Sequence, residues 1–150
     1  MSFQLSQKSL DNLIGVDERL IAVVKRAITL TTVDFGVIEG RRSMERQREL
    51  VDKGASQTMA SKHVYGQAVD LMAYIGPRAS WELNLYDDIA DAIKAAAMAE
   101  NVAIRWGAAW NIPDICKWAG SMAAAMNFYI DERRREGRRP FIDGPHFEIV

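Results

Sequence analysis

The chain has 150 residues, of which 26% are charged, and a formal net charge of −1 at neutral pH. This length suits one domain that buries about two-thirds of the surface its unfolded chain exposes, so we expect a single domain over residues 1–150. The near-zero net charge gives no overall attraction to nucleic acid. No stretch approaches the roughly 18 apolar residues of a membrane span, so stable membrane insertion is not expected either.

The N-terminal residues 1–8 lack the apolar run that a secretory signal peptide requires. The one cysteine, Cys116, cannot form a disulfide within the chain, which agrees with a reducing compartment. From these two features we expect the protein in the cytoplasm of the cell that makes it.

The first part of the chain predicts a helix, a strand and a second helix. Apolar residues recur at helical spacing over residues 16–30, and Asp17 is placed to cap that helix. Residues 35–39 have strand character, and Ser43 is placed to cap a helix over residues 44–53. Residue 42 is therefore expected where a strand passes into a helix.

The middle of the chain predicts a loop followed by a strand. Residues 55–65 have no periodicity, whereas residues 68–74 alternate like a strand. Gly66 lies between them, and glycine tolerates the backbone angles of a sharp bend. A loop and a strand joined in this way can bring His63 and Asp70 to one point, although they are too far apart in sequence for one helical turn.

The remaining segments predict helices and two more strands. Ser80 is placed to cap a helix that continues to about residue 100, and residues 102–106 follow as a strand. Residues 114–137 carry apolar side chains near helical spacing, which predicts one or two helices. Residues 146–150 alternate as a final strand. The predicted fold class is α+β, with helices packed on a small, mainly antiparallel sheet.

The only two histidines, His63 and His146, lie in short segments whose composition suits one metal ion. A catalytic zinc takes three protein ligands of the His, Asp or Glu type and keeps a fourth position for water. His63, Asp70 and His146 supply that number and kind. Asp70 also interrupts an apolar strand, where an inward carboxylate needs a partner. These three residues are the predicted ligands of Zn²⁺.

Asp143 precedes His146 in the turn Asp-Gly-Pro-His. Amide hydrolysis at a zinc site needs a carboxylate that takes a proton from water and delivers it to the leaving amine. We assign this catalytic role to Asp143, because the turn would hold its carboxylate over the open position of the metal. The alternative is that Asp143 only begins the turn, as Asp-Gly commonly does.

Four sequence blocks follow one another over nearly the whole chain. They are Glu39-Gly40-Arg41-Arg42-Ser43-x-x-x-Gln47, Ser61-x-His63-x-x-Gly66-x-Ala68-x-Asp70, Arg105-Trp106-Gly107-x-x-Trp110 and Asp143-x-Pro145-His146-x-Glu148. In this order they resemble the zinc D-Ala-D-Ala carboxypeptidase and L-Ala-D-Glu endopeptidase family, which includes VanY-like enzymes and many phage endolysins. The resemblance implies a fold of the hedgehog and D,D-peptidase type.

The resemblance also implies roles for polar residues outside the metal segments. Arg42 matches an arginine that in this family stabilises the anionic intermediate or holds a substrate carboxylate, work that suits a permanently charged planar donor. Arg41 is the alternative, and either one can instead be a surface arginine. Ser61 and Gln47 are expected to contact substrate or to support the site, the alternative being simple loop or cap hydrogen bonds.

Several features stay open between a functional and a structural role. Glu148 lies on the His146 side of its strand, where it can orient that ligand. Trp106 and Trp110 line the cleft floor or belong to the core. Residues 114–137 look like an insertion relative to the family. The arginine run 133–139 is either a solvated helix end or a surface that attracts an anionic polymer such as peptidoglycan.

The sequence as a whole predicts a phage endolysin: a zinc peptidase, expected as a monomer, that hydrolyses the L-alanyl-D-glutamate bond of peptidoglycan stem peptides. Such an enzyme accumulates in the host cytoplasm and reaches the wall after a holin permeabilises the inner membrane. The closest alternative is a D,D- or L,D-carboxypeptidase of the same family. An alternative of another class is a non-enzymatic zinc or wall-binding module in which Asp143 is a fourth ligand. A thiol peptidase built on Cys116 is disfavoured, since both histidines are already assigned to the metal.

Overall fold

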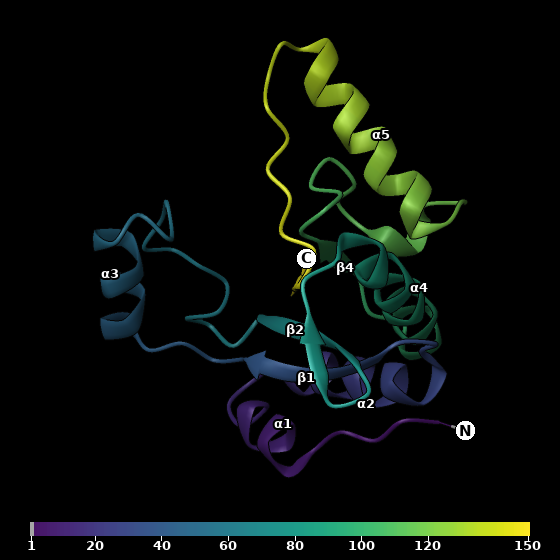
Figure 1. Ribbon diagram of the computed structural model, residues 1–150. Coiled ribbons are helices and arrows are strands. Elements are labelled where there is room, and N and C mark those ends of the chain that lie inside the picture. Colours follow the sequence, from purple (N-terminus) through teal and green to yellow (C-terminus); the bar gives the residue numbers. More distant parts are fainter. Residues whose placement is uncertain (1) are drawn as a thin grey trace.

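The computed structural model describes residues 2–150, in which helices and short strands alternate along the chain (Figure 1). The elements are α1 (Gln7–Asn12), α2 (Glu18–Leu30), β1 (Asp34–Glu39), α3 (Met44–Asp52), β2 (Ala68–Ile75), β3 (Arg78–Ser80), α4 (Leu83–Glu100), β4 (Ile104–Trp106), the 3₁₀ helix η1 (Ile115–Lys117), α5 (Met122–Arg135) and β5 (His146–Ile149). The strands form one antiparallel sheet in the order β1-β2-β5-β4, and β3 pairs with β2 beside this path. The predicted α+β fold is confirmed.

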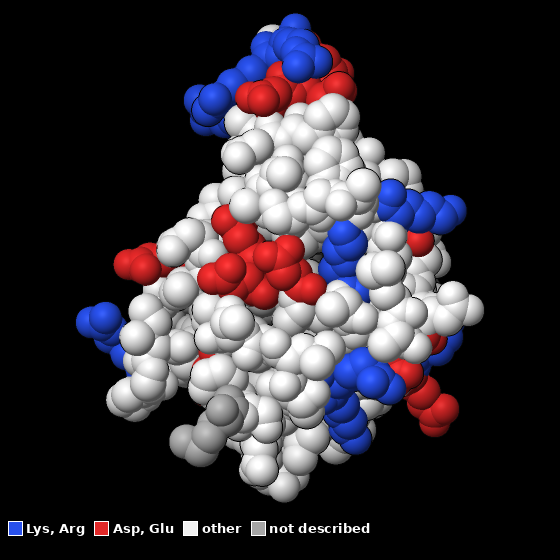
Figure 2. Space-filling model, turned by 90° about the vertical axis from the view of Figure 1, so that its right-hand side faces the viewer, with Lys and Arg blue, Asp and Glu red and all other residues white. Residues whose placement is uncertain are grey.

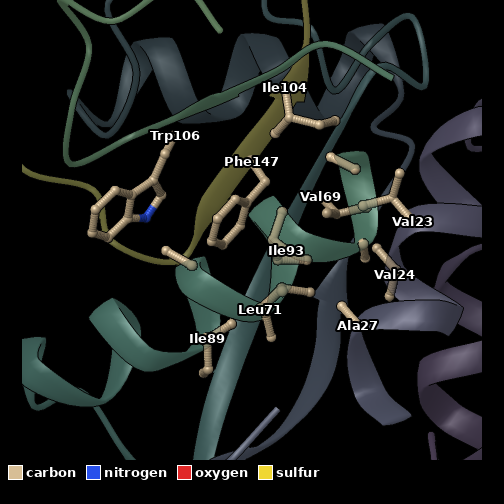
Figure 3. Packing of buried hydrophobic residues seen from close by; sticks show 14 of the residues in the cluster. Val23, Val24, Ala27, Val69, Leu71, Ile89, Ile93, Ile104, Trp106 and Phe147 are labelled. Carbon is tan, nitrogen blue, oxygen red and sulfur yellow. The ribbon is translucent and has the colours of Figure 1, made fainter. Parts of the chain in front are cut away.

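The two faces of the sheet differ because side chains alternate along each strand. On β2, Val69 and Leu71 are fully buried, and on β5 Phe147 is as well. These side chains pack with residues of α2 and α4, which cover that face (Figure 3). Asp70 and His146 alternate with the buried residues and therefore lie on the opposite face. A register slip of one residue in either strand would exchange the two sets.

Two helices project beyond this core, although α5 begins within it: Met122, Ala125 and Met126 are buried in the same cluster. In Figure 1, α3 extends to one side of the sheet, while α5 projects from the top and the chain returns from its tip toward β5. The base of α5 is attached to α4: the Met122 backbone N–H donates to Asp91 at 2.9 Å, and Lys94 donates to the Gly120 carbonyl at 3.0 Å. The helical prediction for residues 114–137 is confirmed by η1 and α5.

The predicted helix caps are confirmed at two positions and wrong at a third. Asp17 and Ser43 accept backbone N–H donors at the starts of α2 and α3. Ser80 does not cap α4, because its backbone is the end of β3, opposite Ala73. The helix begins after Glu82, which makes no side-chain cap hydrogen bond.

Two short elements, α1 and β3, were not predicted. The six residues of α1 are too few for a clear helical period, and Ser9 links this helix to the sheet by accepting the Val37 backbone N–H at 2.9 Å. The three residues of β3 form a strand only because they pair with β2. Among residues 2–150, no helix combines the length and the apolar character needed to cross a membrane.

Candidate functional site

Three strands place one polar side chain each in a row on the open face of the sheet. Glu39 of β1 lies opposite Asp70 of β2, and Asp70 lies opposite His146 of β5. The register of β1 shifts between Val37 and Glu39, and such a bulge redirects the side chain that follows it. The bulge therefore turns Glu39 toward Asp70, while Val37 stays in the core.

His63 reaches the same place from the loop after α3. Its Nδ1–H donates to the Gly40 carbonyl at 2.8 Å, and its own carbonyl accepts the Arg42 backbone N–H at 2.8 Å. The loop then turns at Gly66, where φ is +69° and an added Cβ would lie 2.4 Å from the Gly15 carbonyl oxygen. These contacts leave His63 only 2% exposed, with its Nε2 directed at Asp70.

The two imidazoles converge on one oxygen of Asp70. His63 Nε2 lies 3.2 Å from Asp70 Oδ1, and His146 Nδ1 lies 3.3 Å from the same atom. His63 Nε2 is buried and has no hydrogen-bond partner among residues 2–150. His63, Asp70 and His146 each offer one ligand atom, and these three atoms lie within 4.8 Å of one another. Tetrahedral zinc bonds of about 2.0–2.1 Å put neighbouring ligand atoms about 3.3 Å apart. The donor set and its spacing fit a zinc ion.

His146 is oriented by a second carboxylate. Its Nε2 is 2.8 Å from Glu148 Oε1, two residues along β5, and Lys62 Nζ is 3.7 Å from the other oxygen of Glu148. A carboxylate or carbonyl on the far nitrogen is the usual partner of a metal-binding histidine. His63 has such a partner in the Gly40 carbonyl, and His146 has one in Glu148.

Asp143 lies in a turn that is fixed against the end of β4. Its backbone N–H donates to the Gly107 carbonyl at 2.8 Å, and its carbonyl accepts the His146 N–H at 3.1 Å. A Cβ at residue 107 would lie 2.2 Å from the Asp143 carbonyl oxygen, so only glycine permits this approach. Asp143 lines a cleft of about 500 Å³ together with His63, Asp70 and His146.

Asp70 and Asp143 have pKa values displaced in opposite directions. Burial opposes ionisation of Asp70, but the close imidazoles of His146 and His63 outweigh it and hold its pKa well below the ordinary value. Burial raises the pKa of Asp143, and the negative charge of Asp70 adds to that effect. The cleft thus pairs a carboxylate that stays ionised with a neighbouring carboxyl group that holds a proton more readily, as acid–base sites do.

Comparison with known proteins agrees with this geometry. A family model described as Phage L-alanyl-D-glutamate peptidase matches residues 1–150. The chain belongs to this family. Among its relatives, the L-alanyl-D-glutamate peptidase of Escherichia phage T5 is 29% identical over 154 residues, which cover 100% of both chains. The L-alanyl-D-glutamate peptidase of Listeria phage A118 is 35% identical over 79 residues, or 53% of this chain and 27% of the relative.

A solved structure resembles this chain over almost its full length. The crystal structure of the Serratia marcescens L-Ala D-Glu endopeptidase ChiX matches with a TM-score of 0.75 and 34% sequence identity. The match covers 99% of this chain and 91% of that one. The family expected from the four sequence blocks is therefore confirmed.

Arg42 of the peptidase is buried at the wall of the cleft. Its Nε and Nη2 donate to the two carboxylate oxygens of Glu39 at 2.6 and 2.9 Å, and Nη2 lies 3.9 Å from Asp70 Oδ2. Its Nη1 donates to the Gln47 side-chain carbonyl at 2.7 Å and lies 3.5 Å from Ser61 Oγ. Arg41 is exposed and does not line this cleft. The substrate contacts predicted for Ser61 and Gln47 stay predictions, and both side chains contact Arg42.

The two tryptophans of the third sequence block have different places in the peptidase. Trp106 is fully buried, its indole N–H donates to the Gly144 carbonyl at 2.8 Å, and its ring stacks on Phe147. Trp110 lines the cleft, with its ring centroid 5.4 Å from that of His146. Trp106 therefore belongs to the core and Trp110 to the site, a division that the sequence left open.

Cys116 takes no part in the cleft of the peptidase. Burial raises the pKa of its thiol to about 11, with a contribution from the Asp114 charge, and a protonated thiol is a poor nucleophile. Glu39 and Phe141 do line the cleft, although sequence reasoning assigned neither of them a role. Glu39 is the first residue of the first sequence block, and this position could have indicated a place in the site. Nothing in the sequence indicated one for Phe141.

Proposed function

We propose that this protein is a zinc-dependent endopeptidase that hydrolyses the L-alanyl-D-glutamate bond of peptidoglycan stem peptides, with His63, Asp70 and His146 as the zinc ligands. The observation that carries the proposal is the approach of two imidazole nitrogens to one Asp70 oxygen, at 3.2 and 3.3 Å, in the wall of a cleft. Membership of the L-alanyl-D-glutamate peptidase family supports the choice of bond.

Zinc, when bound, supplies a Lewis acid for the scissile carbonyl and lowers the pKa of a coordinated water to about 7. The chain supplies the orientation of the ligands. Gly40 and Glu148 fix the two imidazole rings through their second nitrogens, at 2.8 Å each. Because these contacts fix both imidazole rings, the other nitrogen of each ring faces Asp70 and can bind a metal ion.

Proton transfer is assigned to the carboxylate of Asp143. Its carboxyl group lines the cleft, and burial raises its pKa above the ordinary value, so that it holds a proton more readily than an exposed carboxyl group does. In this role Asp143 accepts the proton of the attacking water and returns it to the amino group of the departing D-glutamate.

Arg42 contributes a positive charge to the same cleft. Its side chain is 9% exposed and lies between Glu39 and Asp70. These contacts fix the orientation of the guanidinium. It can therefore stabilise a negative charge that develops at one place in the cleft. Gln47 is fully buried and its contacts are with Arg42 and the loop, so we assign Gln47 and Ser61 the role of positioning residues for Arg42.

The biological role that fits is that of an endolysin working as a monomer. Its relatives include peptidases of phages T5 and A118. In this role the enzyme accumulates in the host cytoplasm and reaches peptidoglycan after a holin opens the inner membrane. Expression in a host with and without a holin gene tests this: lysis in both cultures would exclude dependence on a holin.

The metal is tested by zinc analysis of the purified protein. We expect about one zinc per chain, loss of activity in chelator and recovery on addition of zinc. His63→Ala, Asp70→Ala and His146→Ala are each expected to weaken zinc retention. Full zinc content in all three variants would refute the assignment of these residues as zinc ligands.

The bond is tested by mass spectrometry of the products released from purified sacculi. Severed L-Ala–D-Glu linkages are expected. Free D-alanine would instead identify a D,D- or L,D-carboxypeptidase, and intact stem peptides would favour a module that only binds the wall.

A further inference from the structure

A row of mutually tilted aromatic rings (the aromatic stack) leads from the metal site to the rim of the cleft. The ring of Trp110 lies 5.4 Å from that of His146 and 6.3 Å from that of Phe141, measured between centroids. Phe141 forms the outer end of the stack and is 56% exposed, although it is a large apolar side chain. Both aromatic residues line the cleft that contains the predicted zinc ligands.

The stack is held in place by hydrogen bonds from Tyr129 and Arg105. The Tyr129 hydroxyl accepts the Phe141 backbone N–H at 3.1 Å and donates to the Phe141 carbonyl at 3.2 Å. Arg133 donates to the same hydroxyl at 3.1 Å, with its guanidinium 5.5 Å from the Tyr129 ring centre. Arg105 in turn donates to the Trp110 carbonyl at 2.9 Å and lies over its ring. Helix α5 therefore acts as a support for Phe141.

The two walls of the cleft differ in chemistry. The wall formed by the loop after α3 presents hydroxyl, amide and ammonium groups, from Ser56, Gln57, Thr58, Ser61 and Lys62. Trp110, in the loop after β4, and Phe141, on the return from α5, supply the two aromatic rings that line this cleft. The return from α5 lies across from α3 in Figure 1. A substrate that lies across this cleft meets polar groups on one side of the scissile bond and an apolar platform on the other.

The substrate has the same asymmetry. On the carboxyl side of the L-Ala–D-Glu bond stands D-glutamate with its carboxylate. On the amino side, a single L-alanine and a lactyl group connect the bond to a neutral muramyl sugar. These two units span about 7 Å at an extended rise of about 3.5 Å each. Phe141 is connected to His146 through one intervening ring, that of Trp110, so we expect the pyranose to reach it. A pyranose carries a C–H face that an exposed aromatic ring can cover.

We propose that Phe141 and Trp110 form a subsite for the muramyl sugar on the amino side of the scissile bond, with Tyr129 as the positioning residue for Phe141. This subsite rests on the proposed cleavage of the L-Ala–D-Glu bond at the His63–Asp70–His146 site. It gives the segment that looked like an insertion a role in substrate selection. Removing the platform weakens binding of substrates that carry the sugar and leaves substrates that lack it unaffected.

The test compares two synthetic substrates of identical peptide sequence. One carries N-acetylmuramic acid on L-alanine, and the other carries an acetyl group there. Phe141→Ala is expected to raise KM for the muramyl substrate about tenfold with little change in kcat, and to change KM for the acetyl substrate less than about twofold. Phe141→Trp is expected to restore the muramyl KM. Tyr129→Phe removes the hydroxyl without changing the ring, so its muramyl KM is expected to rise by less than that of Phe141→Ala.

Phe128→Ala is the matched control, because Phe128 is 38% exposed on α5, next to Tyr129, but packs on Trp118, outside the cleft. Equal changes of KM for both substrates in Phe141→Ala, or an unchanged muramyl KM, would overturn the sugar subsite while leaving the peptidase assignment intact. Failure of the wild-type enzyme to cleave either substrate at the L-Ala–D-Glu bond would overturn the proposed function and the subsite with it.

Discussion

His63 and His146 reach the same cleft from regions that are built differently. His146 stands on β5, which pairs with β2 on one side and β4 on the other, so its position follows from the register of three strands. His63 stands on a loop without regular structure, and its position depends on the Gly40 carbonyl, the Arg42 backbone N–H and the turn at Gly66.

The difference shows two ways of fixing a side chain for catalysis. A strand fixes direction through many repeated hydrogen bonds, so a single lost contact changes little. A loop fixes direction through a few contacts, each of which is needed. The position of His63 is therefore the more sensitive to backbone substitutions in its own segment, and that of His146 is sensitive mainly to loss of the side chains that contact it. Three predictions test this contrast, and a fourth concerns the tip of α5.

The largest effect is expected from Asp143→Ala, in the turn that leads into β5. Removing the proton carrier should lower turnover about 10²–10⁴-fold, the scale of general acid–base catalysis, because the turn backbone that supports Asp143 stays in place. Zinc stoichiometry and hydrolysis rate are measured on the same preparation. Zinc content should be that of the wild type; weaker zinc binding would make Asp143 a fourth ligand, and near-normal hydrolysis would refute its assignment.

A large effect on stability is expected from Gly66→Ala on the loop side. The residue has φ of +69°, and its new Cβ would meet the Gly15 carbonyl oxygen at 2.4 Å. We expect a loss of about 3 kcal/mol or more in the free energy of unfolding, measured by urea denaturation. Gly54→Ala is the control, since φ is +76° there and nothing lies within 4 Å of an added Cβ. Its expected cost is about 1 kcal/mol, and equal losses in both variants would contradict a tightly built loop.

An intermediate effect is expected from Glu148→Ala. The variant removes the carboxylate 2.8 Å from His146 Nε2 but none of the strand pairing. Loss of such a partner typically lowers metal affinity about 10–100-fold, which competition with a chelator of known affinity measures. A stable fold with weakened zinc binding would support the view that the position of His146 depends mainly on the side chains that contact it. Unchanged zinc affinity would mean that the strand alone orients His146.

The smallest effect is expected outside both regions, at the tip of α5. Figure 2 shows basic and acidic side chains mixed at this projecting end, and Arg135 and Arg138 lie 3.9 and 3.5 Å from Glu132 and Glu136. Replacing Arg134, Arg135, Arg138 and Arg139 by glutamine should slow lysis of whole sacculi a few-fold at low salt, since attraction to an anionic polymer is screened by salt. Arg133 is kept because it supports Tyr129. Equal slowing on a small soluble muropeptide would exclude a role in polymer attraction.

Much of the site was predictable because its residues belong to recognisable local patterns. The apolar alternation of residues 68–74 predicted the strand that carries Asp70, and the helices capped by Asp17 and Ser43 lie where their sequence signals put them. The convergence of His63, Asp70 and His146 was inferred from residue type and order, and the structure brings the three together.

Other features were not predictable because no local signal encodes them. The start of α4 was misplaced, since Ser80 has the composition of a cap but is held in β3 by its partner strand. Trp106 and Trp110 have the same chemistry, and only their surroundings separate a core ring from a cleft ring. The role of Gln47 as a support for Arg42 likewise depends on burial that the sequence does not show.

The fold class, the set of metal-type donors and the family could be predicted from the chain alone, because they depend on residue type, spacing and order. How the donors meet depends on the tertiary structure. The bulge that turns Glu39 toward Asp70, the glycine at 107 that lets the Asp143 turn approach β4, and the aromatic stack from His146 to Phe141 all join residues distant in sequence. Such contacts arise from strand register and side-chain packing across the whole chain, and no short segment contains them.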